Sequence, residues 1–378
     1  MAAMEKNNKT LNVPHLRFPE FSGEWERHSL GEIGSTLIGL TYSPADVVKE
    51  DGVIVLRSSN IQDGEIDYKD LVRVNKKIKD SLFTKKNDIL ICARNGSSRL
   101  IGKNALISDD DTGHSYGAFM MVYRSEDNPF VRQLLCTKKY FAQVGENLGA
   151  RINQITTSDM NSFEFFFPQS KEERSKVASF LRLIDERIST QKKIIKKYES
   201  LIRGLCEKLT RQGATNKTIA ECLECHSSTL QESAVLDAGS YPVYGAIGIC
   251  GYTDTPDVSG DGILIIKDGA SVGVTYFADG SYSSIGTLNR LTAKEDINLR
   301  YIYYCLKVLN FTPYKTGLAI PHIYFKDYGK HKIWCPPLEQ QSSIADALTT
   351  IDNKIQVEKS LLEQLNSQKR YMLNQMFI

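Results

Sequence analysis

The sequence has 378 residues, of which 41% are hydrophobic and 24% charged, and its formal net charge is +2. These values are ordinary for a globular protein, and the absence of any apolar run of about 18 residues excludes a membrane-spanning helix. A near-neutral net charge leaves nucleic acid open as a partner, because basic side chains can gather on one face.

Residues 1–23 are predicted to form an N-terminal tail. Their polar beginning lacks the apolar core of a secretory signal. The eight cysteines are scattered along the chain, and an intracellular protein would keep such thiols reduced. We therefore expect a cytoplasmic protein.

Residues 24–170 are predicted to form a first globular domain. Short apolar runs such as 87–91 are bounded by Gly, Asn, Asp and Ser, which is typical of strands joined by tight turns. The stretch 131–144 predicts a short helix. The expected fold class is mixed α/β with a strand-dominant core.

Residues 213–337 are predicted to form a second domain of the same kind. The apolar run 261–265 corresponds to 87–91, and each run is followed by a polar, Gly-bearing loop. Near the domain ends, 149–155 corresponds to 317–323. The stretch 299–309 predicts a helix. Weak similarity at corresponding places indicates an internal repeat.

Two long helices are predicted at 171–212 and 338–378. The pattern apolar-Ala-x-x-Leu-x-x-Ile-Asp-x-x-Ile begins at Val177 and recurs from Ile344. An apolar period of 3.5 residues is typical of supercoiling helices, and roughly 35–38 residues give a rod about 50–55 Å long. The predicted helix-pairing positions are Val177, Leu181, Ile184, Ile188, Ile195, Ile202, Ile344, Leu348, Ile351, Ile355, Leu362 and Leu365.

The repeat therefore consists of a domain followed by a helix, present twice. Two such copies related by a pseudo-two-fold axis would pair their helices as an antiparallel coiled coil. Gln191 and Glu358 interrupt the apolar seam at the same position in both copies, and a buried polar layer can set helix register. Two unrelated buried helices would share this register only by coincidence.

Three short patterns suggest chemistry without supporting it. Cys222-Leu-Glu-Cys225-His226 resembles a haem attachment sequence or half of a zinc site, but no second ligand pair follows at regular spacing. Asp127-Asn-Pro-Phe130 resembles a methyltransferase motif without its second Pro. No P-loop pattern occurs either. The sequence therefore predicts no catalytic centre and no metal site.

The duplicated architecture is similar to the specificity (S) subunit of Type I restriction-modification systems. This resemblance covers nearly the whole chain. It rests first on the beginnings of the two helices, which are Glu172 with 178–188, and Pro337, Glu339 and Gln340 with 345–355. It rests also on two sequence motifs that recur in that family, at 13–25 and at 241–245.

The resemblance implies a non-catalytic subunit with two target recognition domains, each reading one half of a bipartite site on double-stranded DNA. The helices would set the spacing and bind two methyltransferase (M) subunits, and translocase/nuclease (R) subunits would join that core. No cofactor is expected in this chain, since S-adenosylmethionine, ATP and Mg²⁺ would belong to the partner subunits. A coiled-coil scaffold without a DNA role and a stand-alone DNA methyltransferase are the alternatives.

Base reading requires planar or paired hydrogen-bonding groups, such as Arg on guanine and Asn or Gln on adenine. The candidate DNA-binding residues carry such groups or lie in the same loops. In the first domain they are Arg57, Ser59, Asn60, Arg94, Asn95, Ser98, Arg99, Arg151, Asn153 and Gln154. In the second they are Tyr244, Lys267, Asp268, Ser271, Asn289, Arg290 and His322.

Overall fold

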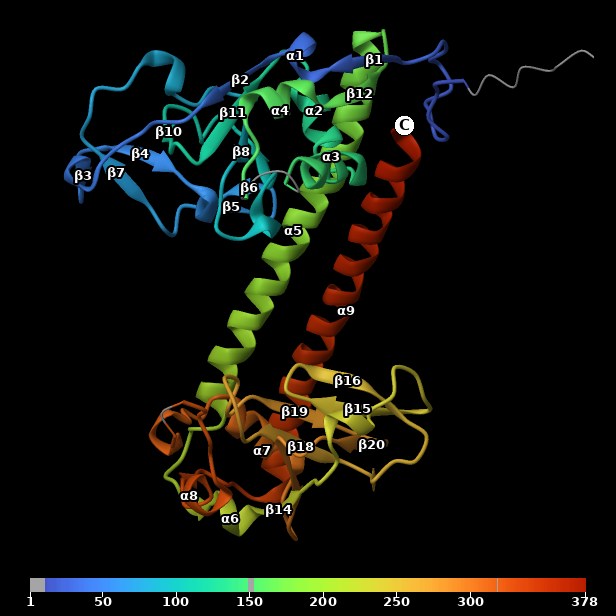
Figure 1. Cartoon of the computed structure of the whole chain (residues 1–378). Coiled ribbons are helices and arrows are strands. Elements are labelled where there is room, and N and C mark those ends of the chain that lie inside the picture. The colour runs from blue at the N-terminus through green and yellow to red at the C-terminus, as the bar shows by residue number, and fades with distance from the viewer. Residues whose placement is uncertain (1–10, 149–152, 318) are drawn as a thin grey trace, which may run out of the picture. The chain divides into compact units, whose positions relative to one another are not determined.

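The computed structural model describes residues 11–148, 153–317 and 319–378. The chain divides into two compact units, Met1–Ser189 with Glu363–Ile378, and Thr190–Leu362. Each unit holds one strand-rich domain and part of each of two long helices (Figure 1). The mixed α/β fold with two strand-dominant domains is thereby confirmed. Among the described residues, no helix is both long and apolar enough to cross a membrane.

The first domain contains two four-stranded sheets and two small strand pairs. One sheet has the order β2 (Ser35–Ile38), β11 (Met120–Arg124), β8 (Ile89–Cys92), β9 (Asn104–Leu106). The other has the order β10 (Ser115–Tyr116), β4 (Val53–Leu56), β7 (Val72–Val74), β3 (Val47–Val48). The pairs are β1 (Glu26–Ser29) with β12 (Glu164–Phe167), and β5 (Ile61–Gln62) with β6 (Glu65–Ile66).

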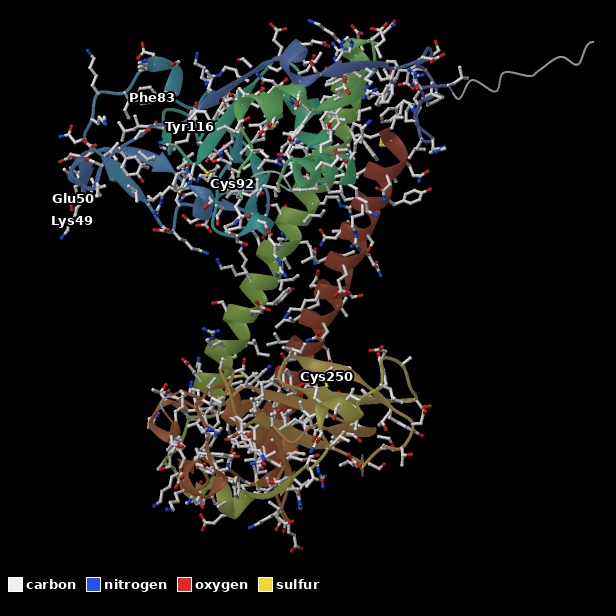
Figure 2. The ribbon with its side chains drawn as sticks, viewed as in Figure 1. Lys49, Glu50, Phe83, Cys92, Tyr116 and Cys250 are labelled. Carbon is white, nitrogen blue, oxygen red and sulfur yellow. The ribbon has the colours of Figure 1, made fainter. Side chains whose placement is uncertain are left out.

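The core of the first domain lies between these sheets. All four side chains of β8 are buried, as expected for a continuous apolar run in a central strand. Cys92 and Tyr116, labelled in Figure 2, belong to one buried cluster with Leu90 and Val122. Burial raises the pKa of the Cys92 thiol to about 11, so this cysteine stays protonated at neutral pH.

Short helices close the first domain. The predicted helix at 131–144 is two helices, α2 (Asn128–Leu134) and α3 (Lys138–Leu148), because the chain turns between them at residues 135–137. The Asp127-Asn-Pro-Phe130 pattern begins α2, with Pro in its first turn, where a missing N–H has no cost. The helices are α1 (Leu30–Ile33), α2 (Asn128–Leu134), α3 (Lys138–Leu148) and α4 (Thr157–Ser162).

Residues 11–23, within the predicted tail, contact the long helices of the first unit. The Arg17 guanidinium forms a two-bond ion pair with Glu173, at 2.7 and 2.8 Å, and Trp25 Nε1 donates to the same carboxylate. The Leu16 N–H donates to the Gln375 carbonyl. Glu173 is almost fully buried, so its charge depends on Arg17 for compensation.

Removing Arg17 is therefore expected to destabilise the protein. Arg17→Ala leaves the Glu173 carboxylate buried without its cation, which costs about 3 kcal/mol in the free energy of unfolding. Chemical denaturation measures this loss. Lys176→Ala is the matched control, because its ion pair with Glu20 is exposed and such pairs contribute below about 1 kcal/mol. Equal stability of the two variants would contradict the prediction.

The second domain is built in a similar way, with two four-stranded sheets and one small strand pair. One sheet has the order β14 (Leu223–Ser227), β21 (Leu288–Ala293), β18 (Gly262–Ile266), β19 (Thr275–Ala278). The other has the order β16 (Gly248–Thr253), β15 (Tyr241–Gly245), β20 (Ser281–Ser284), β17 (Val258–Ser259). The remaining elements are the pair β13 (Lys217–Thr218) with β22 (Lys332–Ile333), and helices α6 (Ile219–Cys222), α7 (Leu299–Lys307) and α8 (Phe325–Tyr328).

The two domains share one feature of strand pairing. In each, the second sheet contains one parallel pair, β4 with β10 in the first domain and β15 with β20 in the second. The Gly117 N–H donates to the Leu56 carbonyl at 3.0 Å, and the Ile285 N–H donates to the Tyr244 carbonyl at 2.9 Å. These bonds give a residue-by-residue correspondence between the domains, which the weak sequence similarity alone did not provide.

The Cys222–His226 pattern does not converge on one point. Cys222 ends α6, and a hydrogen bond between its thiol and the Cys335 thiol lowers the pKa of Cys335 below its usual value. His226 lies on β14 and bonds to the Thr292 hydroxyl at 3.0 Å. Within the described ranges, no group of three or more His, Cys, Asp or Glu side chains is arranged to hold a metal.

The long helices are α5 (Lys171–Leu209) and α9 (Leu338–Met376), each of 39 residues. In the second unit, Ile202 and Cys206 line one hollow with Asp352 and Ile355, while Gln191 bonds Glu358. Residue numbers thus rise along α5 as they fall along α9, so the helices run in opposite directions there. Of the predicted seam residues, Ile351 and Leu362 are half-buried and the others are buried.

The polar interruption of the seam is a contact between equivalent residues. Gln191 Nε2 donates to both the carboxylate and the backbone carbonyl of Glu358, 167 residues away, and both residues are buried. Residues at equivalent positions of the repeated pattern therefore meet within the second unit. Hydrogen bonds from Lys354 and then Gln191 hold the pKa of Glu358 below its usual range, so the carboxylate is charged at neutral pH.

Candidate nucleic-acid interface

In the first domain, two distant loops are joined where β8 ends. The Ile155 N–H donates to the Ala93 carbonyl at 2.9 Å, and the Asn95 N–H donates to the Asn153 carbonyl at 3.3 Å. The Asn153 side chain donates to the Gly96 carbonyl at 2.9 Å. These bonds bring four predicted site residues to one place, namely Arg94, Asn95, Asn153 and Gln154. Ser98 begins the short 3₁₀ helix Ser98–Leu100 that follows in the same loop.

In the second domain, the same bonds occur where β18 ends. The Ile323 N–H donates to the Lys267 carbonyl at 2.9 Å, and the Gly269 N–H donates to the Pro321 carbonyl at 2.9 Å. His322 pairs with Asp268 in an isolated β-bridge, as Gln154 pairs with Arg94 in the first domain. We call these two structures the joined loops: residues 94–99 with 153–155, and residues 267–271 with 321–323.

The joined loops present different side chains on this shared backbone. In the first domain, Arg94 and Arg99 are exposed, and the Arg94 guanidinium lies 5.1 Å from the centre of the Phe119 ring. In the second, the His322 imidazole bonds the Asp268 carboxylate at 2.7 Å. Guanidinium, amide and imidazole groups are the planar donors and acceptors that base edges accommodate. The two joined loops therefore carry different polar side chains.

The loop after β4 extends the first site. Asn95 Nδ2 donates to the Ser58 hydroxyl at 2.9 Å, which links this loop to the joined loops. Ser59 is exposed on the short 3₁₀ helix 58–60. Arg57 is held by the Asp70 carboxylate at 2.7 Å. The loop after β4, the end of β8 and the joined loops thus form one polar surface.

Asn60 has a different position. Its side chain is fully buried and donates to the Asp67 and Asp70 carbonyls, each at 2.9 Å, while its oxygen accepts from the Arg57 N–H. A buried amide with these three bonds shapes the loop and has no edge directed to solvent. Asn60 thus positions Ser58 and Ser59 in this structure.

Three predicted residues of the second domain lie apart from its joined loops or face the interior. Asn289 is buried and its oxygen accepts from the Ser227 hydroxyl at 3.0 Å. Tyr244 and Arg290 both contact the Tyr282 side chain. Gly262 makes this possible, because a Cβ there would lie 2.2 Å from the Tyr282 hydroxyl. Arg290 also borders a hollow of about 310 Å³.

The sequence prediction missed Ser58 and Phe119. Ser58 lies between the predicted residues Arg57 and Ser59, so a prediction of the whole loop 57–60 would have included it. Phe119 is 58% exposed and its carbonyl accepts from both Ala93 and Arg94, but only the folded chain brings it beside them. Arg151 lies outside the described residues, and Ser271 is exposed in its loop.

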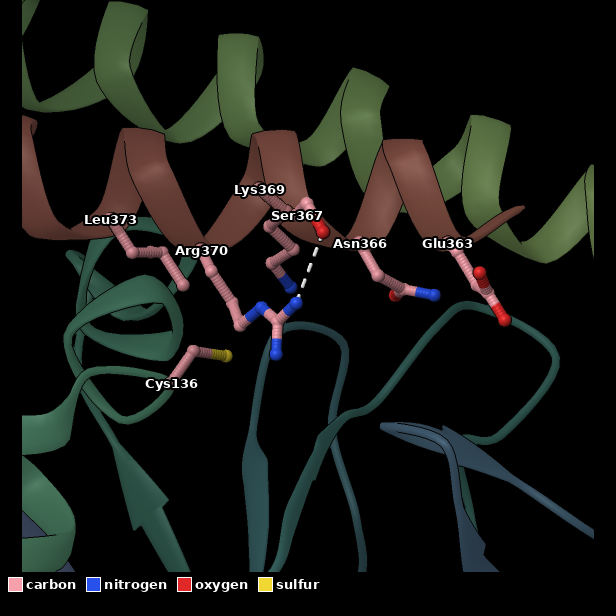
Figure 3. A pocket seen from close by; sticks show the side chains of 7 residues that line it. All are labelled: Cys136, Glu363, Asn366, Ser367, Lys369, Arg370 and Leu373. Atoms are coloured by element: carbon pink, nitrogen blue, oxygen red, sulfur yellow. Dashed lines mark hydrogen bonds between the residues drawn. The ribbon is translucent and has the colours of Figure 1, made fainter. Parts of the chain in front are cut away.

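A separate hollow of about 590 Å³ borders the end of α9 in the first unit (Figure 3). Arg370 Nη2 donates to the Ser367 hydroxyl at 3.0 Å, and Lys369 is ion-paired with Asp185. Cys136 closes the opposite side. Two of its basic groups already have partners on the helices, which suits helix packing better than ligand capture.

Comparison with known proteins agrees with this architecture. Residues 214–367 match the family model described as the Type I restriction modification DNA specificity domain. The Type I restriction enzyme MjaVIII specificity subunit of Methanocaldococcus jannaschii is 33% identical over 32% of this chain and 29% of its own. The EcoKI specificity subunit of Escherichia coli is 26% identical over 52% of this chain and 44% of its own. These matches span less than half of either relative.

A solved structure extends the likeness to the whole fold. The Type I restriction-modification S subunit from M. genitalium superimposes with a TM-score of 0.67 at 19% identity, covering 97% of this chain and 99% of that one. By these comparisons the chain is similar to the specificity subunits of Type I restriction-modification systems, which confirms the resemblance drawn from its sequence.

Proposed function

We propose that this chain is the sequence-specific DNA-recognition subunit of a Type I restriction-modification complex. Each domain would read one half of a bipartite site on double-stranded DNA through its joined loops. The chain itself would be non-catalytic. Methyltransferase subunits would supply the S-adenosylmethionine site, and translocase/nuclease subunits would use ATP and Mg²⁺.

The observation that carries this proposal is the pair of joined loops. Both domains retain the same two backbone hydrogen bonds at the end of the same buried strand, β8 or β18. Yet the paired side chains are Arg94 with Gln154 in one and Asp268 with His322 in the other. A constant backbone with different polar side chains suits two readers of different base sequences.

The long helices would perform two tasks in such a complex. A 39-residue helix extends about 58 Å, which is commensurate with half-sites separated by somewhat more than one DNA turn of about 34 Å. As an antiparallel coiled coil they would hold both readers on one DNA molecule, so that two weak contacts add through effective concentration. Their outer faces would bind the M subunits.

The test is a single substitution in one reader. In the complex with its methyltransferase subunits, Arg94→Ala should weaken discrimination at one base pair of one half-site by about 10- to 100-fold. Methylation rates measured on a DNA library with both half-sites randomised report this change. Arg27→Ala is the matched control, since Arg27 is exposed on β1 beside Glu164, away from the joined loops.

The outcomes separate the candidate functions. Relaxed specificity confined to one half-site supports a reader with two independent domains. Unchanged specificity with normal methylation would remove Arg94 from the interface. Methylation by the chain without any partner would favour a stand-alone methyltransferase instead.

A further inference from the structure

The tip of the hairpin β15–β16 exposes an isoleucine without an evident structural use. The strands are joined by Ala246 and Ile247, and Ile247 is 87% exposed. Gly248 follows at a φ of +100°, a value that suits glycine. Residues at such tips are usually Gly, Asn, Asp or Ser. Ile249, at the start of β16, is 52% exposed as well, so the tip presents two large apolar side chains outside the core of its own domain.

The correspondence between the domains places this tip in the recognition surface. Leu56 and Tyr244 occupy the same position, because each accepts the N–H that follows a parallel strand pair. Two residues further along, Ala246 takes the place of Ser58, and Ile247 takes the place of Ser59. Ser58 is the residue bound by Asn95 of the joined loops. The tip is thus the second domain's version of the loop 57–60.

Contacts within the second domain hold the tip in place. Tyr276 Oη donates to the Ala246 carbonyl at 3.1 Å. Tyr276 lies on β19 opposite Leu264 of β18, the strand that leads directly to the joined loops at Lys267. At the base of the tip, a Cβ on Gly245 would lie 3.0 Å from Cys250 Sγ, so the strands are closely packed there. Cys250 is labelled in Figure 2.

We propose that Ile247 contacts the C5-methyl group of a thymine in the half-site read by the second domain. The thymine methyl is the one apolar feature that base pairs present in the major groove, and apolar side chains recognise it. This inference rests on the proposed function and adds a specificity-determining residue to it. Ile249, also exposed, would border the same groove.

The experiment removes the apolar group of one partner at a time, either the thymine methyl group or the Ile247 side chain. In the assembled methyltransferase complex, each thymine of the second half-site is replaced in turn by deoxyuridine, which lacks only the C5-methyl group. The wild-type protein should lose about fourfold in methylation rate at one position, since one buried methyl group contributes a factor of this size. Ile247→Ala should lose a similar factor on thymine and become insensitive to deoxyuridine at that position.

Controls keep the result specific. Leu236→Ala is the matched variant, because Leu236 is an exposed apolar residue of the same domain, 47% exposed and bridged to Tyr252 away from the tip. It should retain the wild-type response to deoxyuridine. Ile247→Val, which retains part of the apolar surface, should give an intermediate response.

Two results would overturn the inference. One is that Ile247→Ala retains the full wild-type response to deoxyuridine at every thymine. The other is that Ile247→Ala fails to assemble with the methyltransferase subunits, which would mark the tip as a protein contact. Either result leaves the proposed function intact if the wild-type complex still methylates a bipartite site. Absence of any sequence-specific methylation by the wild-type complex would instead overturn the proposed function and this inference together.

Discussion

Exchanging residues 26–167 for the corresponding domain of another specificity subunit is expected to change one half of the methylated site and leave the other half unchanged. These limits follow the structure, since β1 begins at Glu26 and pairs with β12, which ends at Phe167. Trp25 is retained because it bonds Glu173 and packs against Phe377, at a ring separation of 6.2 Å.

The expected effect of this exchange is large. Each mismatched base pair costs about 1–3 kcal/mol, roughly additively, so loss of a whole half-site should lower methylation of the original site by about 10³-fold or more. Sequencing of methylated host DNA, with the exchanged and the original gene, identifies both half-sites. The reciprocal exchange of the second domain is the control. A change in both half-sites, or in neither, would contradict the assignment of one reader to each domain.

Adding one heptad after Gln191 and one after Glu358 is expected to lengthen the unspecified spacer of the recognised site. Seven residues preserve the 3.5-residue apolar period, so the seam remains in phase. Each helix becomes about 10 Å longer, equivalent to about three base pairs at roughly 3.4 Å each. Both half-sequences should be retained while the spacer grows by up to this number.

A matched insertion of two residues at each position distinguishes the effect of the seam's orientation from the effect of helix length. Two residues rotate the apolar seam away from its partner helix, so this variant should lose assembly with the methyltransferase subunits. Methylation rates on DNA with systematically varied spacers report the result, and the original spacing should lose activity by about 10³-fold in the heptad variant. If that variant still prefers the original spacing, the helices do not measure the distance between half-sites.

The sequence by itself determined the architecture of this protein. A helix is a local structure, so the 3.5-residue recurrence from Val177 and again from Ile344 was enough to predict α5 and α9 with their beginnings at residues 171 and 338. Buried strands such as β8 and β18 were recognisable for the same reason, as continuous apolar runs ending in polar loops. The repeat placed Gln191 and Glu358 at equivalent positions before their hydrogen bond was known.

Only the tertiary structure decided which polar residues form a surface. Arg94 meets Gln154, and Asp268 meets His322, through bonds between segments more than fifty residues apart, which no local pattern encodes. Asn60 and Arg57 have the same kind of sequence neighbourhood, yet Asn60 is buried in three hydrogen bonds. Ile247 is apolar and was not among the residues selected from the sequence, and only the strand register of the two domains shows that it occupies the position of Ser59. Periodicity is written in neighbouring residues, whereas a recognition surface is assembled from distant ones.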